Sequence, residues 1–169
     1  EEAKLPPTFA VVHAVNRTVM RVEAAAFHAD MHADKAALYR PNLRALIESG
    51  LLVPGELYLR AMRIKRVFRR EMEAALNGWD ILLTPTTATP APADLSTTGD
   101  PIFQVPWSTA GLPTITLPIG PAGNGLPLGL QLVAGGDHRW ARAALDRPHA
   151  LPAHARAALA GLLQQPAVE

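Results

Sequence analysis

A single apolar stripe between Pro54 and Gly78 constrains the fold more than any other feature of the sequence. Its residues recur at helical spacing, and they are Leu57, Ala61, Ile64, Phe68, Met72 and Ala75. Proline suits the first turn of a helix, and glycine suits the position just beyond the last turn. We therefore expect one long amphipathic helix that ends at about Asn77 and buries one face in a core.

Apolar residues at helical spacing also run from about Phe9 to Lys35, which predicts a second long amphipathic helix earlier in the chain. They are Val15, Val19, Val22 and Ala26. Pro41 interrupts this helix or lies just beyond it. A short helix from about Asn42 to Glu48 follows, and we expect Gly50 to end it in the left-handed conformation.

The character of the chain changes after Gly78. The run DILLTP, which ends at Pro85, is short, apolar and closed by proline, as is typical of a buried strand. The following stretch, TTATPAPADLSTTGDP, has no periodicity. We expect it to form a long irregular connection.

Two later segments predict a β-hairpin. Thr114–Pro118 is strand-like, leucines alternate through GLPLGLQLVAGG, and the turn dipeptide NG, which ends at Gly125, lies between them. Pro118 and Pro127 cannot donate hydrogen bonds to a sheet, so we place them at strand ends, edges or bulges.

An Ala-rich tail follows Gly136 and offers two helices separated by Pro148 and Pro152. We divide the chain into a helical section (1–78), a strand and loop section (79–136) and a divergent helical tail (137–169).

Composition narrows the classes of function. The net charge is +1, so no global field favours nucleic acid or an anionic membrane. The chain has no Cys, which excludes disulfides and thiolate chemistry and fits a cytoplasmic protein. No apolar run approaches the roughly 20 residues that span a bilayer. The chain opens on Glu1 and Glu2 without Met or a signal peptide, so we expect a piece of something longer.

Three features suggest chemistry but do not establish it. His28 and His32 have the spacing of a helical metal pair, but the local third ligand is missing, so we assign no metal and no cofactor. The segment YLRAMRIKRVFRR is densely basic, and we interpret it as a solvated helix face. Ser108 has no neighbouring base in the sequence, so hydrogen bonding is a better role for it than nucleophilic attack.

Three segments together resemble the C-terminal part of the amidase signature family. They are WDILLTPTTATPAPA, FQVPWSTAGLPTITLPIG and GLPLGLQLVAGG, and the helical segments EAAAFHADMHADKAALYRPNLRALIESG and ELYLRAMRIKRVFRREMEAAL match the part that precedes them. The likeness covers roughly Val12 to Gly136. It implies an α/β fold, namely part of an α/β/α sandwich in which helices flank a mixed β-sheet.

The resemblance also implies carboxamide hydrolysis through a Ser, cis-Ser, Lys triad. The Gly/Ser-rich stretch that carries both serines in the family has no counterpart here, and neither has the catalytic lysine. We therefore assign no catalytic residue. Phe103, Trp107 and Ser108 are the candidates for substrate binding, as apolar wall and polar handle of the pocket. The alternative is that all three merely pack in the core.

One departure bears on the substrate. The glutamine-using subunit of tRNA-dependent amidotransferases, which the chain also resembles, typically has Asp two residues before the Phe at position 103. This chain has Pro101 there, with Asp100 one step away. The departure favours a general amidase, although a shift of one residue could restore the acid.

We thus expect a C-terminal amidase fragment that supplies scaffold and pocket wall and is inactive alone. Its partners would be the N-terminal half of the fold, from the same gene or a separate chain, and further copies of itself that hide unpaired strand edges. Two alternatives stay open. One is a fragment like the glutamine-using amidotransferase component, which acts with the partners of tRNA-dependent amidation. The other is a non-enzymatic binding module that uses the basic helix at 60–70 for an acidic partner. We expect no membrane partner and no nucleic acid.

Overall fold

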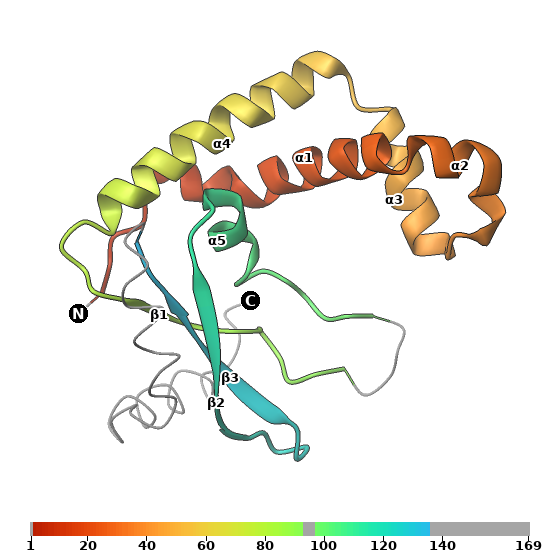
Figure 1. Cartoon of the computed structure of the whole chain (residues 1–169). Coiled ribbons are helices and arrows are strands. Elements are labelled where there is room, and N and C mark those ends of the chain that lie inside the picture. The colour runs from red at the N-terminus through yellow and green to blue at the C-terminus, as the bar shows by residue number, and fades with distance from the viewer. Residues whose placement is uncertain (1, 93–96, 136–169) are drawn as a thin grey trace. The chain divides into compact units, whose positions relative to one another are not determined.

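The structure, a computed structural model, describes residues 2–92 and 97–135. The chain forms two compact units, which we treat separately (Figure 1). The helical unit comprises Leu5–Glu71, and the sheet unit comprises the described residues up to Lys4 and from Met72 onward. The tail expected at 137–169 lies outside the described residues. Within the part of the chain that is described, no helix is both long and apolar enough to cross a bilayer.

The helical unit contains two short 3-10 helices and four α-helices. They are η1 (Pro7–Val11), α1 (Val12–Phe27), α2 (Ala29–Lys35), η2 (Ala36–Leu38), α3 (Pro41–Leu51) and α4 (Gly55–Ala75), the last of which runs into the sheet unit. The single helix expected from Phe9 to Lys35 is wrong, because the chain departs from helical geometry at His28 (φ −93°, ψ 6°). At this break, Nδ1 of His28 lies 3.0 Å from the Tyr39 hydroxyl, and the two rings meet edge to face.

Helices α1 and α4 share a small apolar core. Val15 and Val19 of α1 pack with Ala61 of α4, and Tyr58, Met62 and Ile64 cover this cluster. The predicted stripe on α4 is confirmed at Ala61, Phe68 and Met72, which are all buried. It differs at its ends, where Leu57 is 46% exposed and Leu76, four residues after Met72, is buried.

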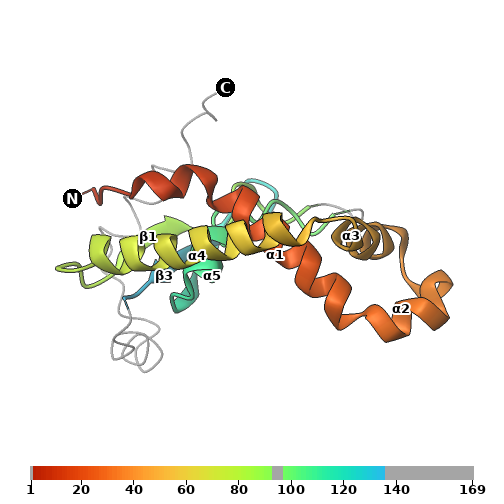
Figure 2. The same ribbon diagram turned by 90° about the horizontal axis from the view of Figure 1, so that it is seen from above.

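Gly50 does not end a helix, as the sequence suggested, but lies inside α3 and is buried. A Cβ atom at this position would lie 2.0 Å from the Arg21 carbonyl oxygen of α1 and 2.9 Å from the Ala25 side chain. Both distances are shorter than atoms tolerate, so glycine is what allows α3 to approach the backbone of α1. Figure 2 shows α3 beside the α2 end of α1.

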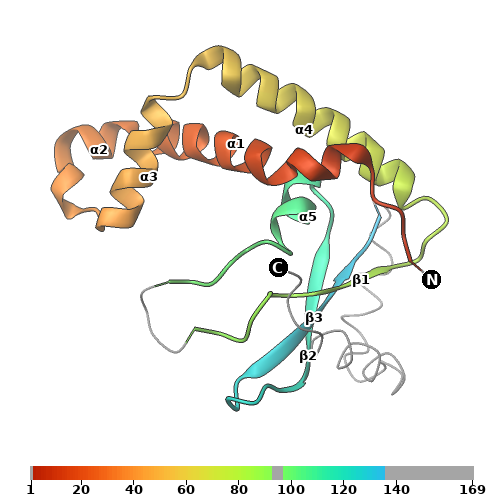
Figure 3. The ribbon, with the colours of Figure 1, turned by 180° about the vertical axis from the view of Figure 1, so that it is seen from behind.

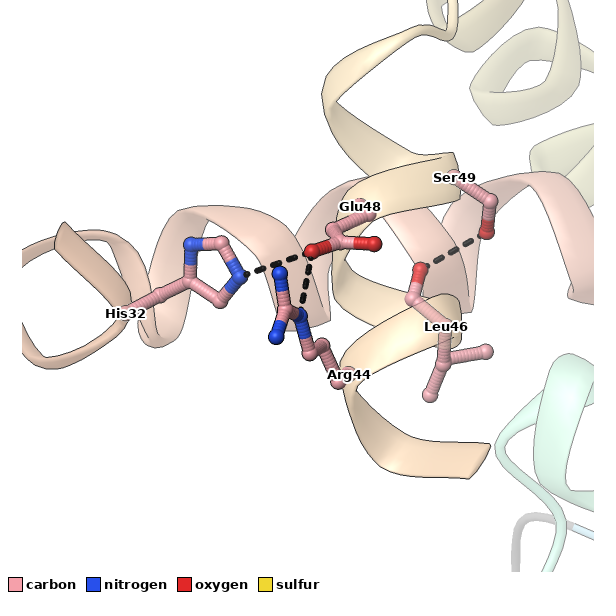
Figure 4. A network of polar contacts seen from close by, with 5 residues as sticks. All are labelled: His32, Arg44, Leu46, Glu48 and Ser49. Atoms are coloured by element: carbon pink, nitrogen blue, oxygen red, sulfur yellow. Dashed lines mark hydrogen bonds and ion pairs between the residues drawn. The ribbon is translucent and has the colours of Figure 1, made fainter. Parts of the chain in front are cut away.

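A polar cluster around Glu48 contains an ion pair within α3 and a contact to His32 of α2 (Figure 4). Nε of Arg44 donates to Oε1 of Glu48 at 2.6 Å, and Nε2 of His32 lies 3.6 Å from the same oxygen. The Arg44 hydrogen bond holds the pKa of the Glu48 carboxyl below its ordinary value of 4.5, and the charges of Arg44 and His32 act in the same direction. Desolvation opposes them.

The sheet unit contains three strands and one short helix. They are β1 (Leu82–Pro85), α5 (Val105–Ala110), β2 (Thr114–Pro121) and β3 (Pro127–Val133). The strand order is β1-β3-β2 and both pairings are antiparallel, so the described strands show the predicted hairpin but no parallel pair (Figure 3). Pro118 lies at a register shift of β2, and Pro127 is the first residue of β3, as predicted.

Replacing Gly50 with Ala tests the close approach of α1 and α3. We expect G50A to lower the free energy of unfolding by at least about 2 kcal/mol, because the added methyl group meets backbone that cannot move aside. Urea denaturation measures the difference. The matched control is Gly55→Ala at the start of α4, where no atom lies within 4 Å of the added Cβ. An equal loss in both variants would contradict the steric explanation.

Replacing Glu48 with Gln tests the surface ion pair. Because the pKa of Glu48 is lower in the folded state than in the unfolded state, the carboxylate stabilises the fold above pH 4.5. This contribution is lost as the pH falls through the folded-state pKa. Thermal unfolding should therefore show E48Q less stable than the original chain at pH 7, with the difference disappearing in acid. Glu23→Gln is the control, because Glu23 is exposed in the interior of α1 and forms no recorded ion pair among the described residues. A difference that grows in acid would contradict the assignment.

Candidate functional site

One face of the sheet carries a row of polar side chains, and we call it the polar face, although Leu82 and the buried Val133 lie on that side too. Residues that lie directly opposite each other on antiparallel strands project to the same side. Thr84 of β1 and Thr116 of β2 both lie opposite Gln131 of β3, so the three polar side chains form one row. The opposite face is apolar, and there Leu130 and Leu132 are buried.

Gln131 occupies the centre of the polar row and is only 3% exposed. Its Nε2 donates to Oγ1 of Thr84 at 3.2 Å and to the Phe103 carbonyl oxygen at 2.9 Å. Burying a side-chain amide is unfavourable unless it is hydrogen-bonded, and these two bonds use both of its protons. They tie the segment before α5 to the polar face of the sheet.

Helix α5 was not predicted, although the sequence carries signals for it. Pro106 stands in its first turn, and Gly111 follows its last residue in the left-handed conformation (φ 71°), which only glycine adopts without strain. The Asp100 carboxylate accepts a hydrogen bond from the Ile102 N–H at 3.0 Å. This short turn leads directly into the helix.

The three predicted substrate-binding residues have different surroundings. Trp107 is 2% exposed and belongs to the core, Phe103 is partly buried and Ser108 is exposed. Trp107 and Ser108 are consecutive on α5, so their side chains point about 100° apart around the helix axis. The structure therefore does not bring the three side chains to one surface, and their role in substrate binding stays a prediction.

A cavity of about 360 Å³ lies beside Asp100, at the start of the turn before α5, and over the end of the polar face of the sheet. The polar side chains that line this cavity are five hydroxyl groups and one carboxylate. They belong to Thr86, Thr87, Thr89, Thr98, Asp100 and Thr116. Gly129 forms part of the floor, where an added Cβ would lie 2.7 Å from Oγ1 of Thr86. The predicted residues Phe103, Trp107 and Ser108 do not line it.

The described residues of the sheet unit offer hydrogen bonds but no hydroxyl bonded to a side-chain base, whereas in the helical unit the Thr8 hydroxyl donates to the Glu71 carboxylate. A hydroxyl attacks an amide only when a base or a lowered pKa activates it. In the described part of the sheet unit there is no His, and the one Lys is Lys4 near the N-terminus. Nor does any group of three His, Asp or Glu side chains in the described ranges have the geometry to hold a metal ion.

The missed functional candidate is Gln131. The alternation of leucines with Gln inside GLQLV was a signal for it, because a lone amide on a strand that is otherwise buried needs partners. Those partners come from β1 and from the turn before α5, which are far apart in the sequence. The sequence alone therefore could not identify them.

Comparison with known proteins agrees with the earlier resemblance. The profile of the Amidase family matches residues 7–138. The chain is 41% identical over 118 residues to a subunit of the glutamyl-tRNA(Gln) amidotransferase of Zymomonas mobilis, which covers 62% of this chain and 24% of that protein. It is 38% identical over 99 residues to the AtzE subunit of the 1-carboxybiuret hydrolase of a Pseudomonas species, covering 51% of this chain and 22% of that one.

A solved crystal structure of an amidase superposes with a TM-score of 0.73 at 29% identity. The superposition covers 81% of this chain and 34% of the solved one. The chain thus spans about a quarter to a third of the length of these relatives. Because the family profile covers most of the sequence, from the first helices through the hairpin, this chain belongs to the Amidase family.

Proposed function

We propose that this chain is the C-terminal part of an amidase that hydrolyses carboxamides, and that it supplies scaffold and pocket wall without a nucleophile. The observation that carries the proposal is the polar face of the sheet, where Gln131 and the threonines offer hydrogen bonds but no activated hydroxyl. The coverage of about a third of a solved amidase supports it, because the remaining two thirds have room for the catalytic groups. The chain would act in the cytoplasm, in keeping with its lack of Cys.

The substrate that we propose is a simple carboxamide, as for a general amidase, and not specifically glutamine. The relatives include one component of an amidotransferase and one of a 1-carboxybiuret hydrolase, and their identities to this chain are similar. Pro101 stands where the glutamine-using amidotransferase component typically has Asp, and the neighbouring Asp100 uses one oxygen to hold the turn at Ile102. These features favour a general amidase. The alternative is a fragment like that amidotransferase component.

The partner that we propose is the N-terminal portion of the amidase fold. Within the described residues, β1 and β2 each pair only with β3, so each has an outer edge without a strand beside it. Leu83 of β1 is 46% exposed on the apolar side of the sheet. Open edges and exposed apolar side chains favour association. Isolated copies of the chain would accordingly hide these surfaces in a dimer or larger assembly.

A second candidate is binding of an acidic partner to the basic face of α4. Arg63, Arg66 and Arg70 are exposed, and helical geometry places them within about 60° of one another around the axis. None of the three forms an ion pair that the structure records among the described residues. Like charges three or four residues apart destabilise a helix, and an acidic partner would relieve that repulsion.

The amidase proposal predicts that the isolated chain is catalytically silent. Release of ammonia from simple carboxamides should stay at the uncatalysed rate, and Ser108→Ala should change nothing, because the nucleophile lies outside this chain. Turnover should appear when the chain is co-expressed with the N-terminal portion of an amidase of the family. Turnover by the isolated chain that one Ser or Lys substitution abolishes would overturn the proposal.

The second candidate predicts steeply salt-dependent binding to poly-L-glutamate. Replacing Arg63, Arg66 and Arg70 together with Gln should weaken that binding at least about tenfold at low salt, because three charge-assisted contacts are lost. Fluorescence anisotropy with labelled poly-L-glutamate measures the effect. The control replaces three exposed cations elsewhere on the helical unit, Arg17, Lys35 and Arg40, with Gln. Equal weakening in both variants would mean that net charge alone drives the binding.

A further inference from the structure

The amide of Gln131 lies where the polar face of the sheet meets the segment that leads into α5. It is the buried amide of β3, and its two acceptors belong to different parts of the chain. Thr84 is on the neighbouring strand β1, whereas Phe103 is in the turn before α5. Nε2 of Gln131 donates one proton to each of these two acceptors.

The turn that carries Phe103 is a compact local structure. The Asp100 carboxylate accepts from the Ile102 N–H, and the Pro101 carbonyl oxygen accepts from the N–H groups of Gln104 and Val105 at 2.9 and 3.0 Å. These bonds are all local, so they shape the turn but do not fix its place on the sheet. The bond from Gln131 spans 28 residues and does fix it.

Two hydrogen bonds hold the segments on either side of helix α5. Gln131 of β3 donates to Phe103 before the helix, and the Ala134 N–H, just beyond β3, donates at 3.1 Å to the Pro113 carbonyl oxygen, which extends the pairing of β2 with β3. A helix of six residues has little stability of its own, so its position depends on such anchors. Burial of Trp107 in the core adds apolar contact to these anchors.

We infer that Gln131 is a positioning residue, which sets the location of Phe103–Ser108, the segment that carries the predicted substrate-binding residues, against the sheet. The inference rests on the proposed function for the role of that segment in substrate binding. It does not need that function for the anchoring itself. Gln131 acts through the Phe103 carbonyl group and is not expected to touch the substrate.

Amide hydrogen exchange in the full chain tests the anchoring. In Gln131→Met, which keeps the length of the side chain but removes both protons, the amides of Gln104, Val105 and Ser108 should exchange at least about tenfold faster. That factor corresponds to the loss of one buried hydrogen bond. The amides of β2 and β3 should keep their original rates. Unchanged exchange at residues 104–108, or equal acceleration in the strands, would overturn the inference.

The matched control is Thr84→Val, which removes the other acceptor and keeps the bond to Phe103. It should leave exchange at residues 104–108 within about threefold of the original rate, since the directional bond to the turn persists. If Gln131→Met fails to fold, the anchor can still be tested by hydrogen exchange in the original chain, without any substitution. In the original chain the side-chain protons on Nε2 of Gln131 should be protected as strongly as the Val105 amide, and unprotected protons would refute the anchor.

The functional consequence is tested in the active assembly with the N-terminal portion of an amidase. If the segment Phe103–Ser108 contacts the substrate as proposed, Gln131→Met should raise KM at least about fivefold and leave kcat within about twofold, because displacing the segment weakens substrate binding without altering the reacting groups. A fall in kcat at unchanged KM would contradict positioning. If no assembly turns over, the proposed function has failed, while the exchange experiment still decides whether Gln131 anchors the segment.

Discussion

The central strand β3 is the element on which the sheet unit depends. It pairs with β1 on one side and β2 on the other, so every hydrogen bond between strands of the described sheet involves it. Its two faces have different roles, because Leu130 and Leu132 provide apolar contact and Gln131 provides directed hydrogen bonds. Apolar contact supplies much of the stability of such a unit, whereas the directed bonds decide which segment lies where.

The sequence predicted those parts of the fold that local patterns encode. The stripe on α4 follows from 3.6-residue periodicity, and the hairpin follows from alternation around the Asn124-Gly125 turn. The places of Pro118 and Pro127 follow from the missing N–H of proline. The family resemblance is likewise confirmed, because its motifs are continuous stretches of sequence.

Prediction from the sequence failed where the local structure depends on contacts with residues that are distant along the chain. Gly50 has the pattern of a helix end, but its role is set by the Arg21 carbonyl group of another helix. The break at His28 coincides with a contact to Tyr39, eleven residues away. Gln131 stands in an apolar strand, and its function depends on acceptors 47 and 28 residues earlier. A local pattern carries no information about such partners.

The hydroxyl groups around the cavity are already used in holding the loop and the sheet together. Thr86 donates to Thr116 at 3.4 Å, and Thr87 donates to the Thr89 carbonyl oxygen at 2.7 Å, so their protons already serve the loop and the sheet. Cleaving an amide requires one group that accepts the proton of the nucleophile and one that protonates the leaving amine. Threonines that hold the scaffold in this way are suited to shaping a pocket, in keeping with the proposal that the ammonium and the activated hydroxyl belong to another part of the fold.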